Sequence, residues 1–307
     1  MLKGSPVSWR CAAVLIAVFS LFAWPAAAGE VGYSAIVMDV RGQAFVTHAG
    51  VRKAVDLGRP LYPGDSVETA DGAALTVTYL GSGLEESWAG GAKFSVEKNG
   101  SRPAPARVVQ RERIILPRIS SSQTGSSTNK GLSFQEDMEV GGLSNTRIIE
   151  DRPVFRWTGD PFVKQYRIKL FSFLDSKLLW QKTTRQTELA YPPDGPPLEP
   201  GGRYEWIVEA VINGVRASEK RSCFSLPPSP ELEALRKELQ AQRMQLEAKP
   251  GDHASRLRHI LFLEEHQLYD EALIQYDLLL GRGGPSESLM SRQMQLVRLR
   301  QAACQAD

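Results

Sequence analysis

The sequence is poor in cysteine, almost without net charge and, beyond its first 24 residues, free of long apolar runs. Three cysteines in 307 residues are too few for a disulfide framework, and the pairing of Cys223 with Cys304 stays open. Lysine and arginine number 37 against 35 acidic residues, so the basic surplus typical of nucleic-acid binding is missing. No later stretch reaches the run of about 20 apolar residues that a membrane helix needs. We expect no nucleic-acid partner and no membrane span in the mature chain.

Motifs of common active sites are also missing. The chain has no Gly-x-Ser-x-Gly, no His-Glu-x-x-His and no phosphate-binding loop. None of its many acidic residues is marked as one of the paired carboxylates of a glycosidase. His253, His259 and His266 are spaced by 6 and 7 residues, unlike the i, i+4 pair of a helical metal site. We predict no enzyme, no catalytic residue, no cofactor and no metal site, and we interpret these histidines as surface residues.

Residues 1–28 follow the three-part plan of a secretory signal peptide. Lys3 and Arg10 give it a basic start, an apolar run ends at Trp24, and three alanines close it. Cleavage after Ala28 would place the mature chain in the periplasm, and an uncleaved anchor is the alternative. Because Lys3 and Arg10 would leave with the signal, 35 basic residues would remain against 35 acidic ones.

In segment 29–116, short runs of alternating apolar and polar residues are separated by turn residues, which predicts a β module. Strands are predicted over 34–40, 43–48 and 67–69, and Asp71-Gly72 predicts a tight hairpin from 67–69 into the strand 75–79. Asp65 is the charged residue of most interest. We interpret its carboxylate as a turn acceptor for backbone N–H groups, with cation or partner binding as the alternative.

These features, in this order, resemble the FecR-type domain. The resemblance is carried by Val40-Arg-Gly42, Leu61-Tyr-Pro-Gly-Asp-Ser-Val-Glu-Thr69 and Asp71-Gly72-Ala-Ala-Leu75. It implies a periplasmic β domain used in sensing or protein contact, best known beside iron-uptake signalling. Leu80-Gly-Ser-Gly83 departs from the family pattern, and no cytoplasmic segment or membrane helix precedes the domain. We therefore expect a free-standing, secreted relative.

A flexible Ser/Thr/Gly-rich linker is predicted over 117–150, because the polar run 120–129 cannot bury a core. Domain motion across this linker is the expectation. Just before it, Arg111 and Arg113 belong to the most basic stretch of the chain. They are candidate partner-binding residues for an anionic surface, or else charges that protect an edge strand from aggregation.

Segment 151–227 predicts a β-sandwich of five or six short strands. In its strand 203–211, Tyr204, Trp206, Val208 and Ala210 share one face, which must lie on a second layer. Together with Pro153-x-Phe-x-Trp157, these residues resemble the fibronectin type III family, which implies an immunoglobulin-like spacer or protein-contact module. Trp157, Trp180 and Trp206 are interpreted as core residues, with a carbohydrate platform as the alternative.

Segment 230–304 predicts four helices, with Asp252 as the cap of the second. Pro250 and Pro285 lie 35 residues apart, and Tyr269-Asp-Glu-Ala272 with Tyr276 resembles the tetratricopeptide signature. Gln267 stands where that family usually has glycine. The resemblance implies protein binding in a groove between helices, with Tyr269 and Tyr276 as candidate partner-binding residues. A capping hairpin that only stabilises the fold is the alternative.

The predicted fold is mainly β and multidomain: a FecR-type β domain, an immunoglobulin-like β-sandwich and a short α-helical hairpin region. The predicted function is that of an exported, periplasmic, non-catalytic binding or scaffold protein. We expect a protein partner in the cell envelope or a cell-wall glycan as its ligand. A FecR-like regulator of envelope signalling is the first alternative, and a cell-wall hydrolase with an unrecognised site is the second.

Overall fold

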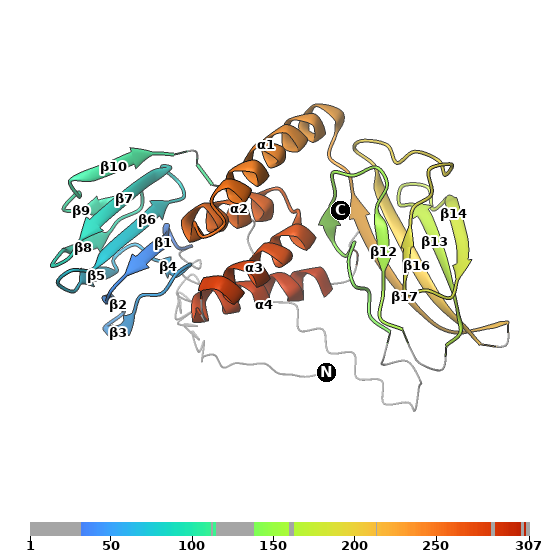
Figure 1. The fold of residues 1–307 in the computed structure, drawn as a ribbon, viewed down its shortest axis with the longest axis horizontal. Coiled ribbons are helices and arrows are strands. Elements are labelled where there is room, and N and C mark those ends of the chain that lie inside the picture. The colour runs from blue at the N-terminus through green and yellow to red at the C-terminus, as the bar shows by residue number, and fades with distance from the viewer. Residues whose placement is uncertain are drawn as a thin grey trace, which may run out of the picture. The chain divides into compact units, whose positions relative to one another are not determined.

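The computed structural model describes residues 32–111, 113–114, 138–159, 163–212, 214–283, 286–301 and 304. The predicted signal peptide and the polar run 120–129 lie outside the described residues. As predicted, the described chain is mainly β, with several sheets and a C-terminal region of four helices (Figure 1). The segment Tyr33–Asp307 forms one compact unit. None of the described helices is both long and apolar enough to cross a membrane.

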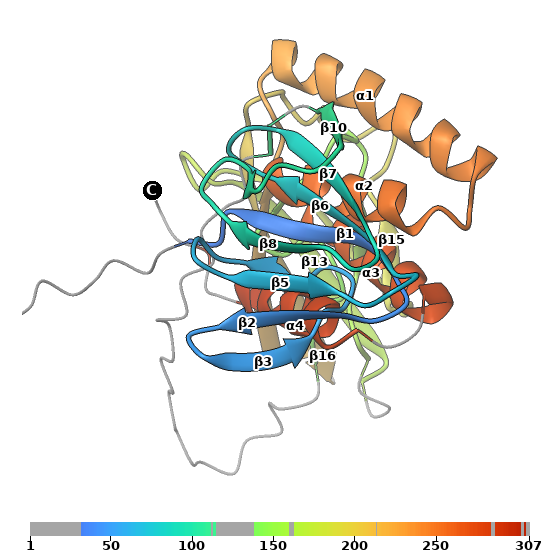
Figure 2. The same cartoon turned by 90° about the vertical axis from the view of Figure 1, so that its left-hand side faces the viewer.

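The first module consists of two five-stranded sheets with the orders β10-β7-β6-β1-β4 and β3-β2-β5-β8-β9. Figure 2 looks onto it, with β3, β2, β5 and β8 side by side. Alternating residues such as Val37, Val67 and Val77 fill the space between the sheets. The strands are β1 (Ala35–Arg41), β2 (Ala44–His48), β3 (Val51–Ala54), β4 (Pro60–Leu61), β5 (Ser66–Thr69), β6 (Ala74–Tyr79), β7 (Leu84–Ala89), β8 (Lys93–Val96), β9 (Ser101–Arg102) and β10 (Arg107–Gln110).

The hairpin predicted at Asp71-Gly72 is wrong. Strand β5 pairs with β2 and β8, whereas β6 pairs with β1 and β7, so the turn carries the chain from one sheet to the other. Gly72 has a positive φ, +73°, as expected for an Asp-Gly turn. The Asp-Gly turn packs against the turn at Gly90. Turn chemistry therefore indicated a reversal correctly without indicating which strands would pair.

Strand β1 is buried on both faces. Ala35 and Val37 point into the first module, while Ile36 and Met38 join the core of the helices. This explains why β1 is apolar at successive positions rather than at every second one. The same strand thus makes the first module and the helical region share a core.

The central module is a β-sandwich. Its larger sheet has the order β11-β17-β16-β13-β14, and β12 pairs with β15 in a second sheet (Figure 1). Phe155 of β12 spans the two layers, with ring centroids 5.1 Å from Trp206 and 5.9 Å from Trp180. Trp157 and Trp206 are buried and Trp180 is half-buried, which confirms the core interpretation for the first two. The strands are β11 (Thr146–Arg147), β12 (Val154–Arg156), β13 (Gln165–Ser172), β14 (Leu178–Thr184), β15 (Glu188–Ala190), β16 (Arg203–Ile212) and β17 (Val215–Ser225).

Residues 138–150, which the sequence assigned to the flexible linker, instead belong to the fold. Strand β11 adds to the sandwich in parallel with β17. Leu143 and Ile148 are buried, and the indole N–H of Trp206 donates to the carbonyl of Leu143 at 3.0 Å. The boundary at residue 150 is corrected to a point before Met138, because Met138 is already buried.

The four helices are α1 (Ser229–Ala248), α2 (His253–Glu265), α3 (Tyr269–Gly283) and α4 (Glu287–Gln301). Asp252 caps α2 as predicted, accepting from the N–H of Ser255 at 3.0 Å. His259 is 2% exposed and lies 2.7 Å from Gln242, so the interpretation of all three helical histidines as surface residues is corrected for this one. Its aliphatic neighbours in α2 draw it into the helical core.

The helices contact both β modules. We call the contact with the first module the first seam; it is formed by Ile36, Met38, Asp56, Gly58 and Glu85 against α2 and α4. We call the contact with the sandwich the second seam; it is formed by residues 143–149 against α1, α3 and α4.

A disulfide joins Cys223 of β17 to Cys304, which follows α4. It resolves the pairing that the sequence left open and fastens the second seam covalently.

Candidate functional site

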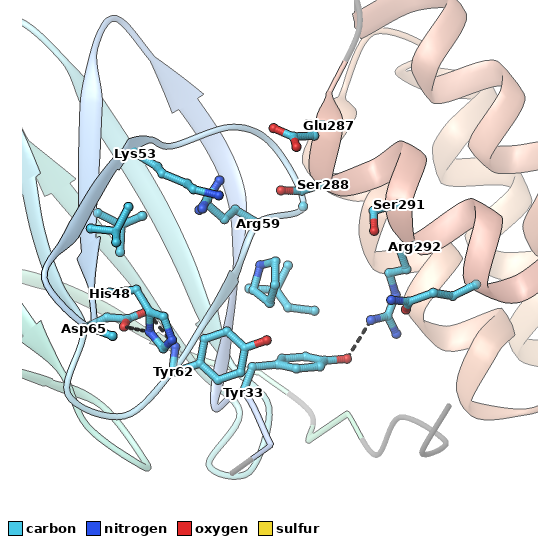
Figure 3. A pocket seen from close by; sticks show the side chains of 17 residues that line it. Tyr33, His48, Lys53, Arg59, Tyr62, Asp65, Glu287, Ser288, Ser291 and Arg292 are labelled. Atoms are coloured by element: carbon cyan, nitrogen blue, oxygen red, sulfur yellow. Dashed lines mark hydrogen bonds and ion pairs between the residues drawn. The ribbon is translucent and has the colours of Figure 1, made fainter. Parts of the chain in front are cut away.

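A pocket of about 540 Å³ lies at the first seam, between the first module and α4 (Figure 3). We call it the junction pocket. Its residues come from Tyr33 just before β1, from β1 to β4 and the turns between them, from the turn between β4 and β5, and from one face of α4. The volume falls in the range of pockets for small molecules.

On the first-module side, the pocket is lined by an acid–base pair and two tyrosines. Asp65 is 2% exposed; one of its oxygens accepts from the N–H of Tyr62 at 2.9 Å, and the other lies 2.5 Å from Nδ1 of His48. The turn interpretation of Asp65 is thereby confirmed. His48 packs on Tyr62 at 4.9 Å, and Tyr62 meets Tyr33 edge-to-face at 6.2 Å. These contacts fix the tyrosine rings in place.

On the helix side, Arg292 of α4 anchors the pocket. Its guanidinium is paired with the buried Glu264 of α2 and donates to the hydroxyl of Tyr33 at 2.6 Å. Tyr276 of α3 also donates to Glu264, at 2.6 Å. Burial opposes the charge on Arg292, but Glu264 outweighs it, so the pKa of Arg292 lies above its usual value. The network therefore joins three helices to Tyr33, just before β1.

The turn after β3 holds the beginning of α4. Asp56 accepts from the N–H and hydroxyl of Ser288, both at 2.9 Å, and from the hydroxyl of Ser286 at 2.8 Å. A carboxylate at this position satisfies free N–H groups of the helix and favours its positive end. Gly58 lies so close to α4 that an added Cβ would stand 2.3 Å from the Leu289 side chain.

Two cations of the first module line the same pocket. Among the described residues, the Arg59 guanidinium reaches only the carbonyl of Ala54 at 3.4 Å and Asp56 at 3.5 Å, both at the outer limit of hydrogen bonding. Lys53 forms no ion pair or side-chain hydrogen bond with any described residue. Neither cation has an ion-pair partner closer than 3.5 Å among the described residues, although the carboxylate of Glu287 also lines the pocket.

Two acidic side chains at this junction already have partners within the chain. His48 and Asp65 engage one another, and Glu264 is occupied by Arg292 and Tyr276. Among the described residues, no group of three or more His, Cys, Asp or Glu side chains could hold a metal ion.

The predicted partner-binding tyrosines lie in the core. Tyr269 is 4% exposed and Tyr276 is fully buried, so neither presents its side chain to a partner. Burial raises the pKa of Tyr269 to about 12. Their prediction is corrected: both tyrosines lie on the α3 face that packs on α2, next to the small Ala272.

The two predicted arginines lie at the end of the first module. Arg111 pairs with Glu85 at 3.0 Å, and the same carboxylate accepts from Arg258 of α2 at 2.9 Å. Arg113 is exposed. Arg111 is therefore part of the first seam, and the structure does not bring these arginines together with the tyrosines in one site.

The junction pocket itself was missed in the sequence. Its two halves are more than 200 residues apart, and neither half carries a recognised motif. The usable signal was in the first module, where Lys53, Arg59 and Tyr62 gather around the Pro-Gly-Asp turn. Nothing in the sequence indicated that α4 would close that surface.

Comparison with known proteins leaves the chain without an assigned family. No family model and no curated protein matches it. A two-domain fibronectin type III segment of chicken tenascin is 8% identical over 64% of this chain and 94% of that one, with a TM-score of 0.23. A β-glucuronidase from Ruminococcus gnavus is 8% identical over 64% of this chain and 34% of the enzyme, with a TM-score of 0.21. TM-scores this low carry no argument about fold or function.

Proposed function

We propose that the protein is an exported, non-catalytic binding and scaffold protein of the cell envelope, and that the junction pocket is its ligand site. The observation that carries this proposal is the pocket's position. It lies where the first module and the helical region meet, and its walls come from both. A ligand that fills it would contact both parts at once.

Domain assignments in this proposal rest on the motifs. The first module would be a FecR-type domain, the central sandwich a fibronectin type III-like spacer, and α2 with α3 a tetratricopeptide-like pair. The backbone at Gln267 supports the last assignment, because its φ of +60° is the left-handed conformation that glycine adopts most readily. That is the position where the tetratricopeptide family usually has glycine.

Export is supported by two independent features. The first 28 residues have the plan of a cleaved signal, and the Cys223–Cys304 disulfide belongs to the chemistry of oxidising compartments such as the periplasm. We propose the periplasm as the location of the mature chain.

A regulator of envelope signalling is the second candidate function. The first seam favours it, because occupancy of a pocket shared by two parts of a chain can bias how those parts are held. In that case the FecR-type domain would transmit ligand binding to a membrane or protein partner.

In-cell photocrosslinking tests the proposal. A photoreactive residue replaces Ala49, which is exposed and lines the pocket, or Ala234, an exposed alanine of α1 that does not. We expect a specific envelope adduct at Ala49 and none at Ala234, with the mature chain beginning at Gly29 in the periplasmic fraction. A cytoplasmic chain, equal adducts at both positions, or release of peptidoglycan fragments by the purified protein would contradict the proposal.

A further inference from the structure

Resting on the proposed function, we further propose that the junction pocket binds a saccharide that carries a carboxylate. The sugar ring would lie against Tyr33 and Tyr62, and the carboxylate would face Lys53 and Arg59. All four residues line the pocket (Figure 3). The proposal concerns reversible binding and involves no covalent step.

The carboxylate of the ligand is inferred from Arg59 and Lys53, which have few partners among the described residues. Asp56 is the nearest carboxylate to Arg59, but it accepts three shorter hydrogen bonds from Ser286 and Ser288 at the start of α4. The guanidinium is left with contacts at 3.4 and 3.5 Å although its side chain is only 18% exposed. A poorly paired and largely enclosed arginine has donors to offer, and a guanidinium matches the geometry of a carboxylate.

The charge of Lys53 reinforces that of Arg59. Lys53 lies on the edge strand β3, and side chains alternate across a strand, so Val51 and Lys53 line the pocket while Arg52 between them does not. Arg52 is engaged elsewhere, with its guanidinium 3.8 Å from the ring centroid of Phe45 and 3.5 Å from Glu68. The strand thus supplies its own matched control residue.

The sugar ring of the ligand is inferred from Tyr33 and Tyr62. Their rings are fixed edge-to-face at 80°, and Arg292 holds the hydroxyl of Tyr33. Fixed aromatic rings with polar tips suit a ligand that is apolar on one face and hydroxylated at its edge. On the opposite side, Ser291 and Gln295 of α4 line the pocket and have no hydrogen bond to any described side chain. They are available for hydroxyl or amide groups of a sugar.

Size and location together favour a saccharide. About 540 Å³ accommodates a small ligand such as a mono- or disaccharide. In the proposed envelope location, acidic sugars are components of the surrounding polymers. A free inorganic anion would use the cations but leave the tyrosine rings unused.

Calorimetric titration of the full disulfide-bonded mature chain tests this inference with matched probes. N-acetylmuramic acid and N-acetylglucosamine share a ring and differ in the lactyl carboxylate, while lactate and inorganic phosphate carry charge without a ring. We expect N-acetylmuramic acid to bind at least about tenfold more tightly than each other probe, the loss expected when one charged hydrogen bond is removed. Lys53→Gln and Arg59→Gln should each weaken it by about tenfold, and Arg52→Gln should leave it unchanged.

Several outcomes would overturn the ligand class: no binding of N-acetylmuramic acid, equal binding of N-acetylglucosamine, equal binding of lactate or phosphate, or binding that is unaffected by Lys53→Gln. Because Lys53 is exposed on an edge strand, its variant should fold normally even if Arg59→Gln does not. If the sugar fails while Ala49 still crosslinks in cells, the ligand class is wrong and the proposed function stands. If the sugar binds while crosslinking fails, the proposed envelope role is wrong.

Discussion

The two seams that join the helices to the β modules are built differently. At the second seam, strand β11 belongs to the sandwich and contacts the helices. The N–H of Tyr269 donates to Thr146, and Arg147 binds Glu231 through two hydrogen bonds of 2.6 and 2.9 Å. A disulfide adds a covalent link. The first seam relies on side chains: Asp56 at the start of α4, Arg258 on Glu85, and the network around Arg292. Between the two parts, the first seam leaves a pocket.

This difference concerns how firmly each seam is held and where it leaves room for a ligand. A backbone hydrogen bond from Arg147 to Gln267 and a covalent link hold the second seam in one arrangement, so the sandwich and helices should behave as a single body. The first seam combines buried charges with an unfilled volume, and a ligand there can add contacts that the free chain does not make. The following predictions, from the largest expected effect to the smallest, would break or sharpen this contrast.

Removing the disulfide should weaken the second seam most. Cys304→Ser opens a link between residues 81 positions apart, and the chain-entropy relation gives a loss of about 4.5 kcal/mol in unfolding free energy. Urea denaturation of oxidised variant and wild type measures it. Reduced wild type is the control and should match the variant. Equal stability of oxidised and reduced wild type would show that the covalent link is unimportant to this seam.

Breaking the buried ion pair should weaken the first seam. Arg292→Met leaves the Glu264 carboxylate buried without its cation, which should lower the unfolding free energy by about 3 kcal/mol. Glu264→Gln with Arg292→Met should recover part of this loss, because no uncompensated charge remains. Denaturant titration of the single and double variants measures both. A harmless single variant would contradict the role of this network.

Adding a methyl group at Gly58 should show how much stability the close packing of the first seam contributes, apart from the backbone strain of any Gly→Ala substitution at positive φ. Gly58 and Gly50 have φ angles of +77° and +81°, but only Gly58 has α4 within reach of an added Cβ. Gly58→Ala should therefore destabilise the protein by about 2 kcal/mol more than Gly50→Ala. Thermal melts of the two variants compare them. Equal losses would mean that Leu289 moves aside freely and that the seam is loosely packed.

Relieving backbone strain at the second seam should stabilise it slightly. Gln267 has a φ of +60°, and its carbonyl accepts from the N–H of Arg147 at 2.9 Å. Gln267→Gly should raise the unfolding free energy by about 0.5 to 1 kcal/mol, because glycine adopts this backbone without a Cβ clash but loses more entropy on folding. Denaturation curves measure the gain. A loss of stability would show that the glutamine side chain contributes more than its backbone costs.

Acid should weaken the second seam by a small amount. The hydrogen bond from Arg147 lowers the pKa of Glu231 below its usual 4.5, against the opposing effect of burial. A lowered folded-state pKa means that the stabilisation is present above about pH 4.5 and is lost as the pH falls through the folded value. Because Glu231 is 39% exposed, we expect less than about 1 kcal/mol. Between pH 5 and pH 3, roughly the range where Glu titrates, Glu231→Gln should lose less stability than wild type. Equal losses in the variant and in wild type would contradict this.

Much of the local structure could be predicted from the sequence. Residue alternation located the strand around Trp206, helical spacing located the buried leucines of α1, and Asp252 was identified as a cap. These features depend on neighbours within a few residues, whose geometry the backbone fixes. The hairpin at Asp71-Gly72 failed because strand pairing depends on distant segments.

The candidate site was harder to predict, because the burial of its residues also depends on segments that are distant in the sequence. Tyr269 and Tyr276 were selected from a motif, yet the contact with α2 buries both. Residues 138–150 were assigned to the linker together with the polar run 120–129, yet Leu143 and Ile148 find an apolar surface made by the sandwich and helices. Burial is a property of what covers a residue, and the covering segments here are remote in sequence.

By itself, the sequence determined the mainly β class, the order of the modules, the C-terminal helices and the charge balance, because each follows from composition or from short periodic patterns. The tertiary structure alone decided that the helices adhere to both β modules, that Cys223 meets Cys304, and that α4 closes a cationic, tyrosine-lined pocket. Its walls meet where Ile36 and Met38 of β1 bury their side chains against the helices and Asp56 holds the start of α4, contacts between segments more than 200 residues apart.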